Sequence, residues 1–183
     1  MRNADVRPTG VEHKLGSEQI IVSKTDAKGH LTYINDVFID ISRYTEAELL
    51  GQPHNIVRHP DTPRCVFKLL WDTISSGKEM FAYLDNLSKD GGHYWVLAHV
   101  TPTFATGGTI VGYHSNRRAP APRAIEQIKP LYAALLAAEK AAGSTPAALA
   151  AGTALLERTL ADRGVGYDEF VWNLTNEALA GVL

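Results

Sequence analysis

The chain has 183 residues, of which 45% are hydrophobic and 21% charged, and its formal net charge is -2. This composition is that of a soluble globular protein with one domain and appendages, and the small net charge gives no general reason to expect nucleic acid or an anionic membrane as partner. The single cysteine, Cys65, excludes an internal disulfide framework and any CxxC motif. No apolar run reaches the ~20 residues of a membrane-spanning helix, and no signal peptide is recognisable, so we expect a cytoplasmic protein without membrane insertion.

The N-terminal part predicts an arm, a hairpin and two short helices. Residues 1–16 are polar and interrupted by proline and glycine, which predicts a flexible N-terminal arm. Two β-branched runs, 19–24 and 30–34, are separated by a turn signal and predict a hairpin. Asn35 or Asp36 can cap a first helix, and Thr45-Glu-Ala-Glu48 matches the capping box of a second.

The segment GQPHNIVRHPDTP, residues 51–63, is here called the central loop. It contains two histidines, one arginine, one aspartate and three prolines. Proline removes an N–H donor and restricts the preceding residue, so no regular helix or strand can run through the segment. The pattern predicts a rigid, irregular loop that presents polar groups to a ligand.

A helix is predicted over residues 62–75, and Val66, Leu69, Leu70 and Trp71 form its apolar side, with Trp71 in the core. Three strands follow over 80–87, 93–104 and 109–117, separated by glycine-rich turns. Together with the first hairpin they predict an α+β fold, a five-stranded antiparallel sheet with short helices on one face.

The composition changes at the segment APAP, residues 119–122, which predicts a boundary. Beyond it the sequence predicts three helices rich in alanine and leucine, and the last has an apolar side of Tyr167, Phe170, Val171 and Leu174. The predicted organisation is therefore an N-terminal arm (1–16), a sensor domain (17–119) and a helical C-terminal extension (120–183).

The segments YINDVFIDISRYTEAELLGQPHNIVRHPDTP and DGGHYWVLAHVTP resemble a PAS domain. More narrowly, they are similar to the sensory PAS domain of the bacterial aerotaxis receptor family, and the resemblance extends from about Gln19 to about Lys140. It implies a PAS fold with a C-terminal helical extension. It also implies a signal-transduction protein, a flavoprotein that senses redox or energy state through non-covalent FAD and reports it to the chemotaxis machinery.

The same resemblance implies the residues that bind the flavin. The R-H-P-D segment corresponds to Arg58, His59 and Asp61, and Asn86 and Trp95 are further family positions. His54 completes the set of candidate cofactor-binding residues. Arginine suits a pyrophosphate, histidine can bond to a ring atom, and an amide can pair with both donors and acceptors.

Purely structural interpretations of these residues also exist. Arg58 and Asp61 can form an ion pair that fixes the loop, Asn86 can satisfy backbone groups at a strand edge, and Trp95 can pack in the core. His54, His59 and Asp61 have a spacing that could hold a metal, but a hydrogen-bonded network is the commoner outcome, so we predict no metal site.

Two alternatives to flavin remain open. Met80 and Ala82 occupy positions where flavin-binding PAS domains often have tryptophan and glycine, which favours a cofactor-free interaction or dimerisation module. Haem is a further alternative, although the helix predicted over 62–75 has no histidine to ligate it.

No pattern of a catalytic site is present, so the chain is predicted not to be an enzyme, and Glu79, Asp85 and Asp90 are interpreted as turn or solvent-facing charges. The expected partners are a second copy of the chain, in a homodimer, and a separate signalling protein such as a receptor or kinase. The sheet or the helical extension would provide the contact surface.

Overall fold

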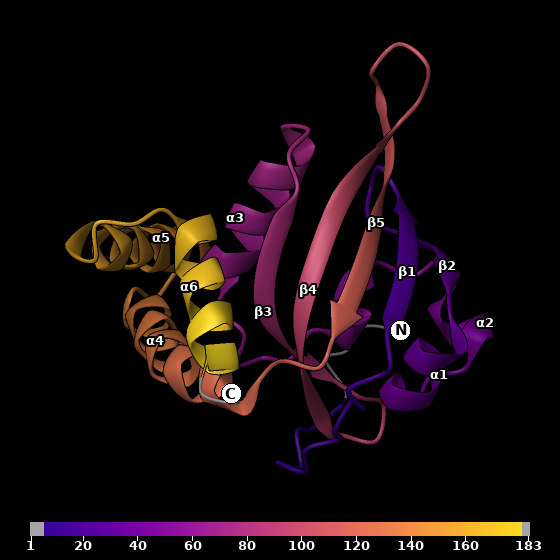
Figure 1. Cartoon of the computed structure of the whole chain (residues 1–183), viewed down its shortest axis with the longest axis horizontal. Helices are drawn as coiled ribbons and strands as arrows, with labels where there is room; N and C mark the ends of the chain where they lie inside the picture. The colour runs from indigo at the N-terminus through magenta and orange to yellow at the C-terminus, as the bar shows by residue number, and fades with distance from the viewer. Residues whose placement is uncertain (1–5, 181–183) are drawn as a thin grey trace. The chain divides into compact units, whose positions relative to one another are not determined.

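The computed structural model describes residues 6–180, and the side chains of residues 6–177. The strands are β1 (Ile21–Asp26), β2 (Leu31–Ile34), β3 (Met80–Leu87), β4 (His93–Phe104) and β5 (Ile110–Arg118). The helices are α1 (Asp36–Ser42), α2 (Glu46–Leu49), the 3-10 helix η2 (His54–Val57), α3 (Arg64–Ser75), α4 (Pro122–Ala141), α5 (Thr145–Asp162) and α6 (Tyr167–Ala180). Figure 1 shows their succession along the chain.

The strands form one five-stranded sheet in the order β2-β1-β5-β4-β3, which can be followed in Figure 1. Every pair of neighbours is antiparallel, so the predicted α+β fold class is confirmed. The predicted bounds of β3 and β4 agree with the structure residue for residue, because glycine-rich turns delimit both strands.

The predicted helix caps are also present. The Asn35 side chain accepts a hydrogen bond from the backbone N–H of Phe38 at the start of α1. Thr45 and Glu48 form the capping box of α2, and Lys89 pairs with the same carboxylate. The hydrogen bond from Lys89, followed by those from Thr45, lowers the pKa of Glu48 to about 2.

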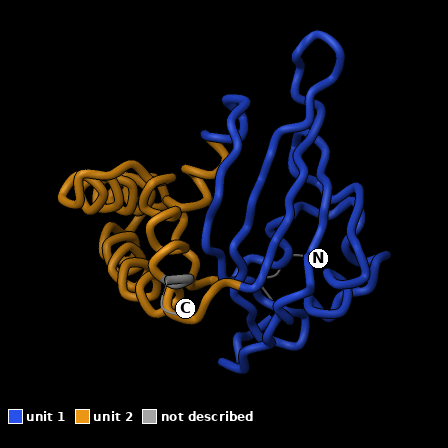
Figure 2. The backbone as a smooth tube through the Cα atoms, viewed as in Figure 1, with its two compact units in different colours: residues 1–59, 73–119 blue, residues 60–72, 120–183 orange. Residues whose placement is uncertain are grey.

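The chain divides into two compact units (Figure 2). The first comprises residues 1–59 and 73–119, and contains the sheet with α1, α2 and η2. The second comprises residues 60–72 and 120–183, and contains α4, α5, α6 and the first nine residues of α3. Residues 60–72 thus belong to the same unit as the C-terminal helices, a grouping for which no signal was found in the sequence.

The two faces of the sheet follow from the strand register, because successive side chains point to opposite faces. Alternate residues of β1, β5, β4 and β3 share one face of the sheet, here called the inner face. They include Ser23, Asn86, Tyr94, Ala98 and Arg117. The helices α1 and η2 of the first unit lie against it, since the Arg117 guanidinium is 4.5 Å from the Phe38 ring and Ser23 contacts His54. The opposite, outer face carries Asp85, His93 and Trp95.

The central loop is bound to both edges of this sheet. Near its start, the backbone of Leu31 in β2 donates to Gln52 and accepts from Gly51, at 2.9 and 2.8 Å. Further along, Arg58 pairs with Asn86 of β3, the strand at the other edge. Residues 51–59 therefore span from one edge strand to the other, and the predicted loop forms a wall across the sheet.

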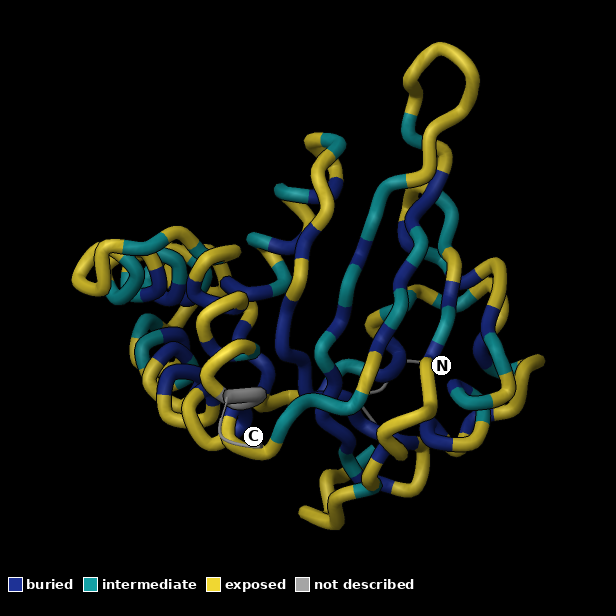
Figure 3. Tube along the Cα trace, viewed as in Figure 1, coloured by how far each residue is buried: buried dark blue, intermediate teal, exposed yellow. Residues whose placement is uncertain are grey.

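Two predictions about exposure are wrong. Trp71 is 38% exposed, because the buried stripe of α3 runs through Val66, Leu70 and Ile74 and leaves the tryptophan outside it. Asp85 was interpreted as solvent-facing, but it is 5% exposed and bonded to His93. Figure 3 shows that the exposed segments include the tip of the β4–β5 hairpin.

The described part of the N-terminal arm is hydrogen-bonded to the β3–β4 hairpin rather than loosely held. The backbone of Thr9 donates to Gly91 at 2.8 Å, that of His13 donates to His93 at 2.7 Å, and the His13 ring contacts Asp90 at 3.0 Å. Residues 1–5 of the predicted arm lie outside the described residues.

Candidate ligand site on the inner face of the sheet

Arg117 of β5 is the most unusual residue of the inner face. Its side chain is buried, with the residue 1% exposed. One guanidinium nitrogen donates to the Ser23 hydroxyl, and the guanidinium lies over the Phe38 ring. Among the described residues no carboxylate forms an ion pair with it, and its Nε and Nη1 groups have no hydrogen-bond partner. A buried guanidinium with unused N–H groups can donate hydrogen bonds to an anion or a carbonyl oxygen of a ligand.

Burial lowers the pKa of Arg117 from 12.5 to about 10, while the nearby Tyr94 acts in the opposite direction. The guanidinium therefore remains charged at neutral pH despite its surroundings. The positive charge is costly for the fold, and a ligand with negative or electron-rich atoms would reduce that cost.

His54 of η2 lies beside this arginine. Its ring stacks on Phe38 with centroids 6.0 Å apart, and its Nε2 is 3.4 Å from the Ser23 hydroxyl. Burial, followed by repulsion from Arg117, lowers the pKa of His54 to about 3. The imidazole is therefore neutral at physiological pH and can offer one donor and one acceptor.

Asn86 and Tyr94 are directly opposite each other on β3 and β4, on the same inner face. Both are buried, at 4% and 0% exposure. Within the described residues, the Asn86 amide nitrogen and the Tyr94 hydroxyl have no hydrogen-bond partner. Burial raises the pKa of Tyr94, which keeps the hydroxyl protonated and available as a donor. Asn86 and Tyr94 thus join Arg117 as buried groups with unused hydrogen-bonding capacity.

The structure places Arg58 and His59 at the edge of β3. The pairing of Arg58 with Asn86 puts Arg58 on the inner-face side, where it is half-buried. His59 is buried with its Nδ1 3.7 Å from Asp85, and its ring is 5.6 Å from that of His93. His93 in turn bonds to Asp85 at 2.9 Å. His59 therefore belongs to a buried Asp–His cluster on the outer-face side.

Of the remaining predicted residues, Trp95 lies on the outer face directly opposite Asp85, and it is 7% exposed. Asp61 is exposed and belongs to the second compact unit. Sequence reasoning thus identified His54, Arg58 and Asn86 near the inner face, but it missed Arg117 and Tyr94. The structure shows why Arg117 was missed: Ser115 and Arg117 share the face of Tyr113 and alternate with half-exposed positions, an arrangement that exists only once β5 pairs with its neighbours.

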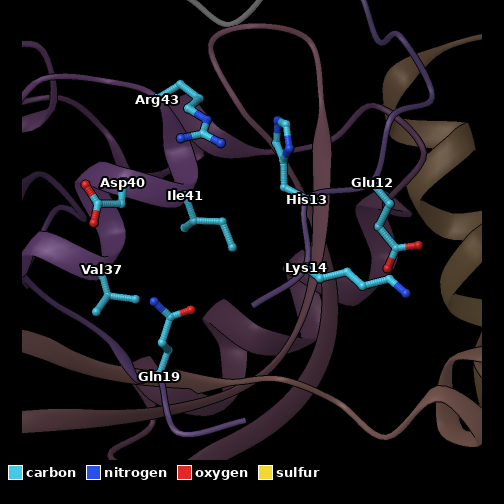
Figure 4. A pocket seen from close by; sticks show the side chains of 8 residues that line it. All are labelled: Glu12, His13, Lys14, Gln19, Val37, Asp40, Ile41 and Arg43. Carbon is cyan, nitrogen blue, oxygen red and sulfur yellow. The ribbon is translucent and has the colours of Figure 1, made fainter. Parts of the chain in front are cut away.

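A hollow of about 430 Å³ is present elsewhere in the first unit, between the N-terminal arm and α1. Its lining residues are Glu12, His13, Lys14, Gln19, Val37, Asp40, Ile41 and Arg43 (Figure 4). Its polar side chains include Gln19, which accepts a hydrogen bond from Gly16, and His13 and Arg43, which both approach Asp90. We assign no ligand to this hollow, because these groups already interact within the protein.

Across residues 6–177, no three side chains of His, Cys, Asp or Glu are grouped so that they could hold a metal ion. None of the helices in the described part of the chain combines the length and apolar character needed to cross a lipid bilayer.

An antiparallel sheet of this strand order, crossed by a loop and lined with buried polar groups, defines a sensory domain of the PAS class. The family model described as PAS fold matches residues 17–115, more than half of the chain, and the chain therefore belongs to this family.

Two curated relatives place the chain among signalling proteins. It is 41% identical over 121 residues to the aerotaxis receptor of Escherichia coli (strain K12), a match that covers 66% of this chain and 24% of that protein. It is 30% identical over 99 residues to the nitrogen fixation regulatory protein of Klebsiella pneumoniae, covering 54% of this chain and 20% of that protein. The match thus spans about a quarter or less of the length of these relatives.

A solved structure shares the fold. The dark structure of the blue-light photoreceptor Aureochrome1 LOV aligns with a TM-score of 0.52 and 24% identity, covering 62% of this chain and 82% of that one. The chain therefore contains a PAS sensor domain for signalling, related to those of the aerotaxis receptor and the nitrogen fixation regulator.

Proposed function

We propose that this domain is a redox or energy sensor that binds a flavin, FAD, non-covalently at the inner face of the sheet. The observation that carries the proposal is the group of Asn86, Tyr94 and Arg117, three buried polar side chains with unused hydrogen-bonding capacity on one face. Buried polar groups normally find partners within the protein or in ordered water, so a shared set on one face suggests a bound molecule. The hydrogen-bonding groups of these three side chains suit a flavin, the cofactor that the resemblance to the aerotaxis receptor family implies.

The residues present suit the parts of a flavin. Asn86 and Tyr94 would hold the polar edge of the ring, because an amide offers both donors and acceptors and the phenol donates. Arg117 would donate to electron-rich oxygens, and neutral His54 can bond either to a donor or to an acceptor. Arg58, at the loop's bridge to β3, would supply a cation for the phosphate part. A bound flavin would supply reversible uptake of electrons and protons.

The other predicted residues receive supporting roles in this proposal. His59 fixes the central loop to β3 through Asp85, and its backbone N–H is 3.4 Å from the Asp85 carbonyl oxygen. Trp95 packs on the outer face opposite Asp85, and Asp61 lies at the exposed end of the loop. These residues would support binding by holding the wall of the site in place rather than by touching the ring.

A change in the ligand would reach the rest of the protein through the strands and the loop. Asn86 is bonded in register to β4 and paired with Arg58 of the loop. A different hydrogen-bond pattern at Asn86 would therefore alter the loop position and bias the packing of the C-terminal helices. The expected recipients are a separate signalling protein of the chemotaxis type and a second copy of the chain.

The test is the visible absorption spectrum of the purified full chain, before and after reconstitution with FAD. Oxidised flavin bands are expected in the wild type, and they should be lost or weakened in Asn86→Ala and Arg58→Ala. Arg118→Ala serves as control, because this exposed arginine is next to Arg117 in β5. A colourless wild type that takes up no flavin on reconstitution would rule the proposal out.

A cofactor-free interaction module is the second candidate, and one observation favours it. Met80 and Ala82 lie on the inner face and are 1% and 0% exposed, so the protein fills part of that face with its own side chains. This candidate predicts no flavin uptake and a homodimer whose mass, measured by light scattering, falls when the chain is truncated at Pro120. An unchanged association state would count against dimerisation through the extension.

A further inference from the structure

The second compact unit contains a hydrogen-bonded contact between distant parts of the sequence. Glu139, near the end of α4, is 6% exposed. Its two carboxylate oxygens accept hydrogen bonds from the backbone N–H groups of Arg64 and Cys65, at 3.0 and 2.9 Å. These are the first two residues of α3, 75 and 74 positions earlier in the chain. A side chain of α4 therefore caps the N-terminus of α3.

This cap supplies hydrogen-bond partners both to the first N–H groups of α3 and to the buried Glu139 carboxylate. The first N–H groups of a helix have no partner within the helix, and the residue before Arg64 is Pro63, which has no side-chain oxygen to supply one. A buried carboxylate needs compensation as well, and helix N–H groups with the positive end of the helix dipole provide it. Breaking the contact would leave both sides unsatisfied.

Helix α5 packs closely against the Glu139 carboxylate and the start of α3. Gly152 of α5 passes so close that a Cβ there would lie 2.6 Å from Oε1 of Glu139 and 3.1 Å from Sγ of Cys65. Arg64 also donates from Nη1 to the hydroxyl of Thr145, at the start of α5, over 3.2 Å. The start of α3 is thus joined to two of the C-terminal helices.

Helix α3 follows the central loop directly. Residues 60–63, the end of the loop, belong to the same compact unit as the cap, whereas residues 51–59 belong to the unit of the sheet. A displacement of the loop therefore acts on the first turn of α3 through the covalent chain. That turn is the one held by Glu139.

We propose that the Glu139 cap is a releasable latch that transmits the position of the central loop to the helices α4–α6. While the loop holds the first turn of α3 in place, the two N–H groups meet the carboxylate and the C-terminal helices are fixed to α3. Displacement of the loop separates them, and the C-terminal helices become free to change partners. The latch is independent of the identity of the ligand.

The first test is amide hydrogen exchange, monitored by NMR, in the flavin-free chain of 183 residues. Glu139→Ala is expected to reduce the protection of the Arg64 and Cys65 amides about tenfold, as for loss of a helix cap worth about 1.4 kcal/mol. Amides of β1–β5 should keep their exchange rates. Glu126→Gln is the control, since this exposed glutamate on the same helix leaves the cap intact. An equal fall in protection over the whole chain would mean general destabilisation and would overturn the latch.

The second test asks whether the latch connects the loop to the helices. His59→Ala should loosen the loop and lower the protection of the Cys65 amide and of amides in α5. In the Glu139→Ala background the same substitution should have no further effect on α5. If the two effects multiply, or if His59→Ala alone leaves the Cys65 amide unchanged, the proposal is wrong.

If Glu139→Ala does not fold, Gly152→Ala replaces it in both tests. This variant retains the carboxylate, but the added methyl group would displace it from the amides of Arg64 and Cys65. Selective loss of protection at those two amides supports the latch, and unchanged protection overturns it. Because these experiments use no flavin, their failure is distinguishable from failure of the proposed function.

Discussion

Replacement of Arg117 by methionine should separate ligand binding from stability. Methionine has a long, flexible side chain that can occupy most of the arginine's space without its charge. In the flavin-free protein the guanidinium is buried without a carboxylate partner among the described residues, so removing its charge relieves a cost. If a flavin binds as proposed, the same substitution would remove a donor to it.

The size of the effect on stability can be worked out from the surroundings of Arg117. The lowering of its pKa from 12.5 to about 10 corresponds to a penalty of about 3 kcal/mol on the charged form, at about 1.4 kcal/mol per pKa unit. Contact with the Phe38 ring offsets about 1–2 kcal/mol and the hydrogen bond to Ser23 about 1 kcal/mol. The free energy of unfolding of flavin-free Arg117→Met should therefore be unchanged or higher by about 1 kcal/mol.

Two measurements on one preparation test this reasoning. Urea denaturation of the flavin-free protein gives the free energy of unfolding, and fluorescence titration with FAD gives the dissociation constant. Loss of a charge-assisted hydrogen bond of about 1.5–3 kcal/mol should weaken FAD binding by about tenfold or more. Arg118→Met, at the adjacent exposed position, should change neither quantity.

The opposite pattern would refute the argument. A structural arginine, whose removal leaves buried partners unsatisfied, would cost about 3–5 kcal/mol when replaced. If Arg117→Met loses stability of that size while FAD binding is unchanged, then the arginine serves the fold and the inner face is not the binding site.

Two further predictions concern stability. The folded state keeps His54 neutral down to a pKa of about 3, whereas the unfolded state takes up a proton below about pH 6.5. The unfolded state thus binds more protons between these values, so the free energy of unfolding should fall as the pH is lowered through this window. His54→Asn should flatten that part of a urea-denaturation series, and an unchanged slope would contradict the assigned burial. Gly112→Ala should cost more than about 2 kcal/mol, because its Cβ would lie 2.2 Å from the Thr25 carbonyl oxygen and disrupt the β1–β5 pairing. Gly166→Ala, where a Cβ meets no atom within 4 Å, is the matched control in thermal denaturation.

The architecture could be predicted from the sequence because its determinants are local. Glycine-rich turns delimit β3 and β4, and the Thr45–Glu48 capping box starts α2. Three of the four residues predicted for the apolar side of α6, Phe170, Val171 and Leu174, are buried, and Tyr167 is half-buried. Each of these signals involves residues within a few positions of one another, where backbone chemistry alone decides the outcome.

The parts that could not be predicted depend on pairing across the sheet or between helices. Asp85 looks like a surface charge until β3 and β4 pair and the loop brings His59 to it. Arg117 looks like one of two consecutive arginines until the register puts one on the inner face and the other outside. Glu139 lies 75 residues from the helix that it caps, and a single sequence carries no signal for such a contact.

The inner face also bears on the choice between the two candidate functions. A module without a ligand would gain stability by replacing Asn86, Tyr94 and Arg117 with apolar residues, because each buries polar atoms without a partner among the described residues. Met80 and Ala82 show that apolar side chains fit on the same face. Polar residues at positions where the fold accepts apolar ones indicate a function that offsets their cost. Their placement on three adjoining antiparallel strands, β5, β4 and β3, near His54 and next to the loop that spans both sheet edges, favours a ligand over a protein partner. A partner protein would have to displace that loop to reach them.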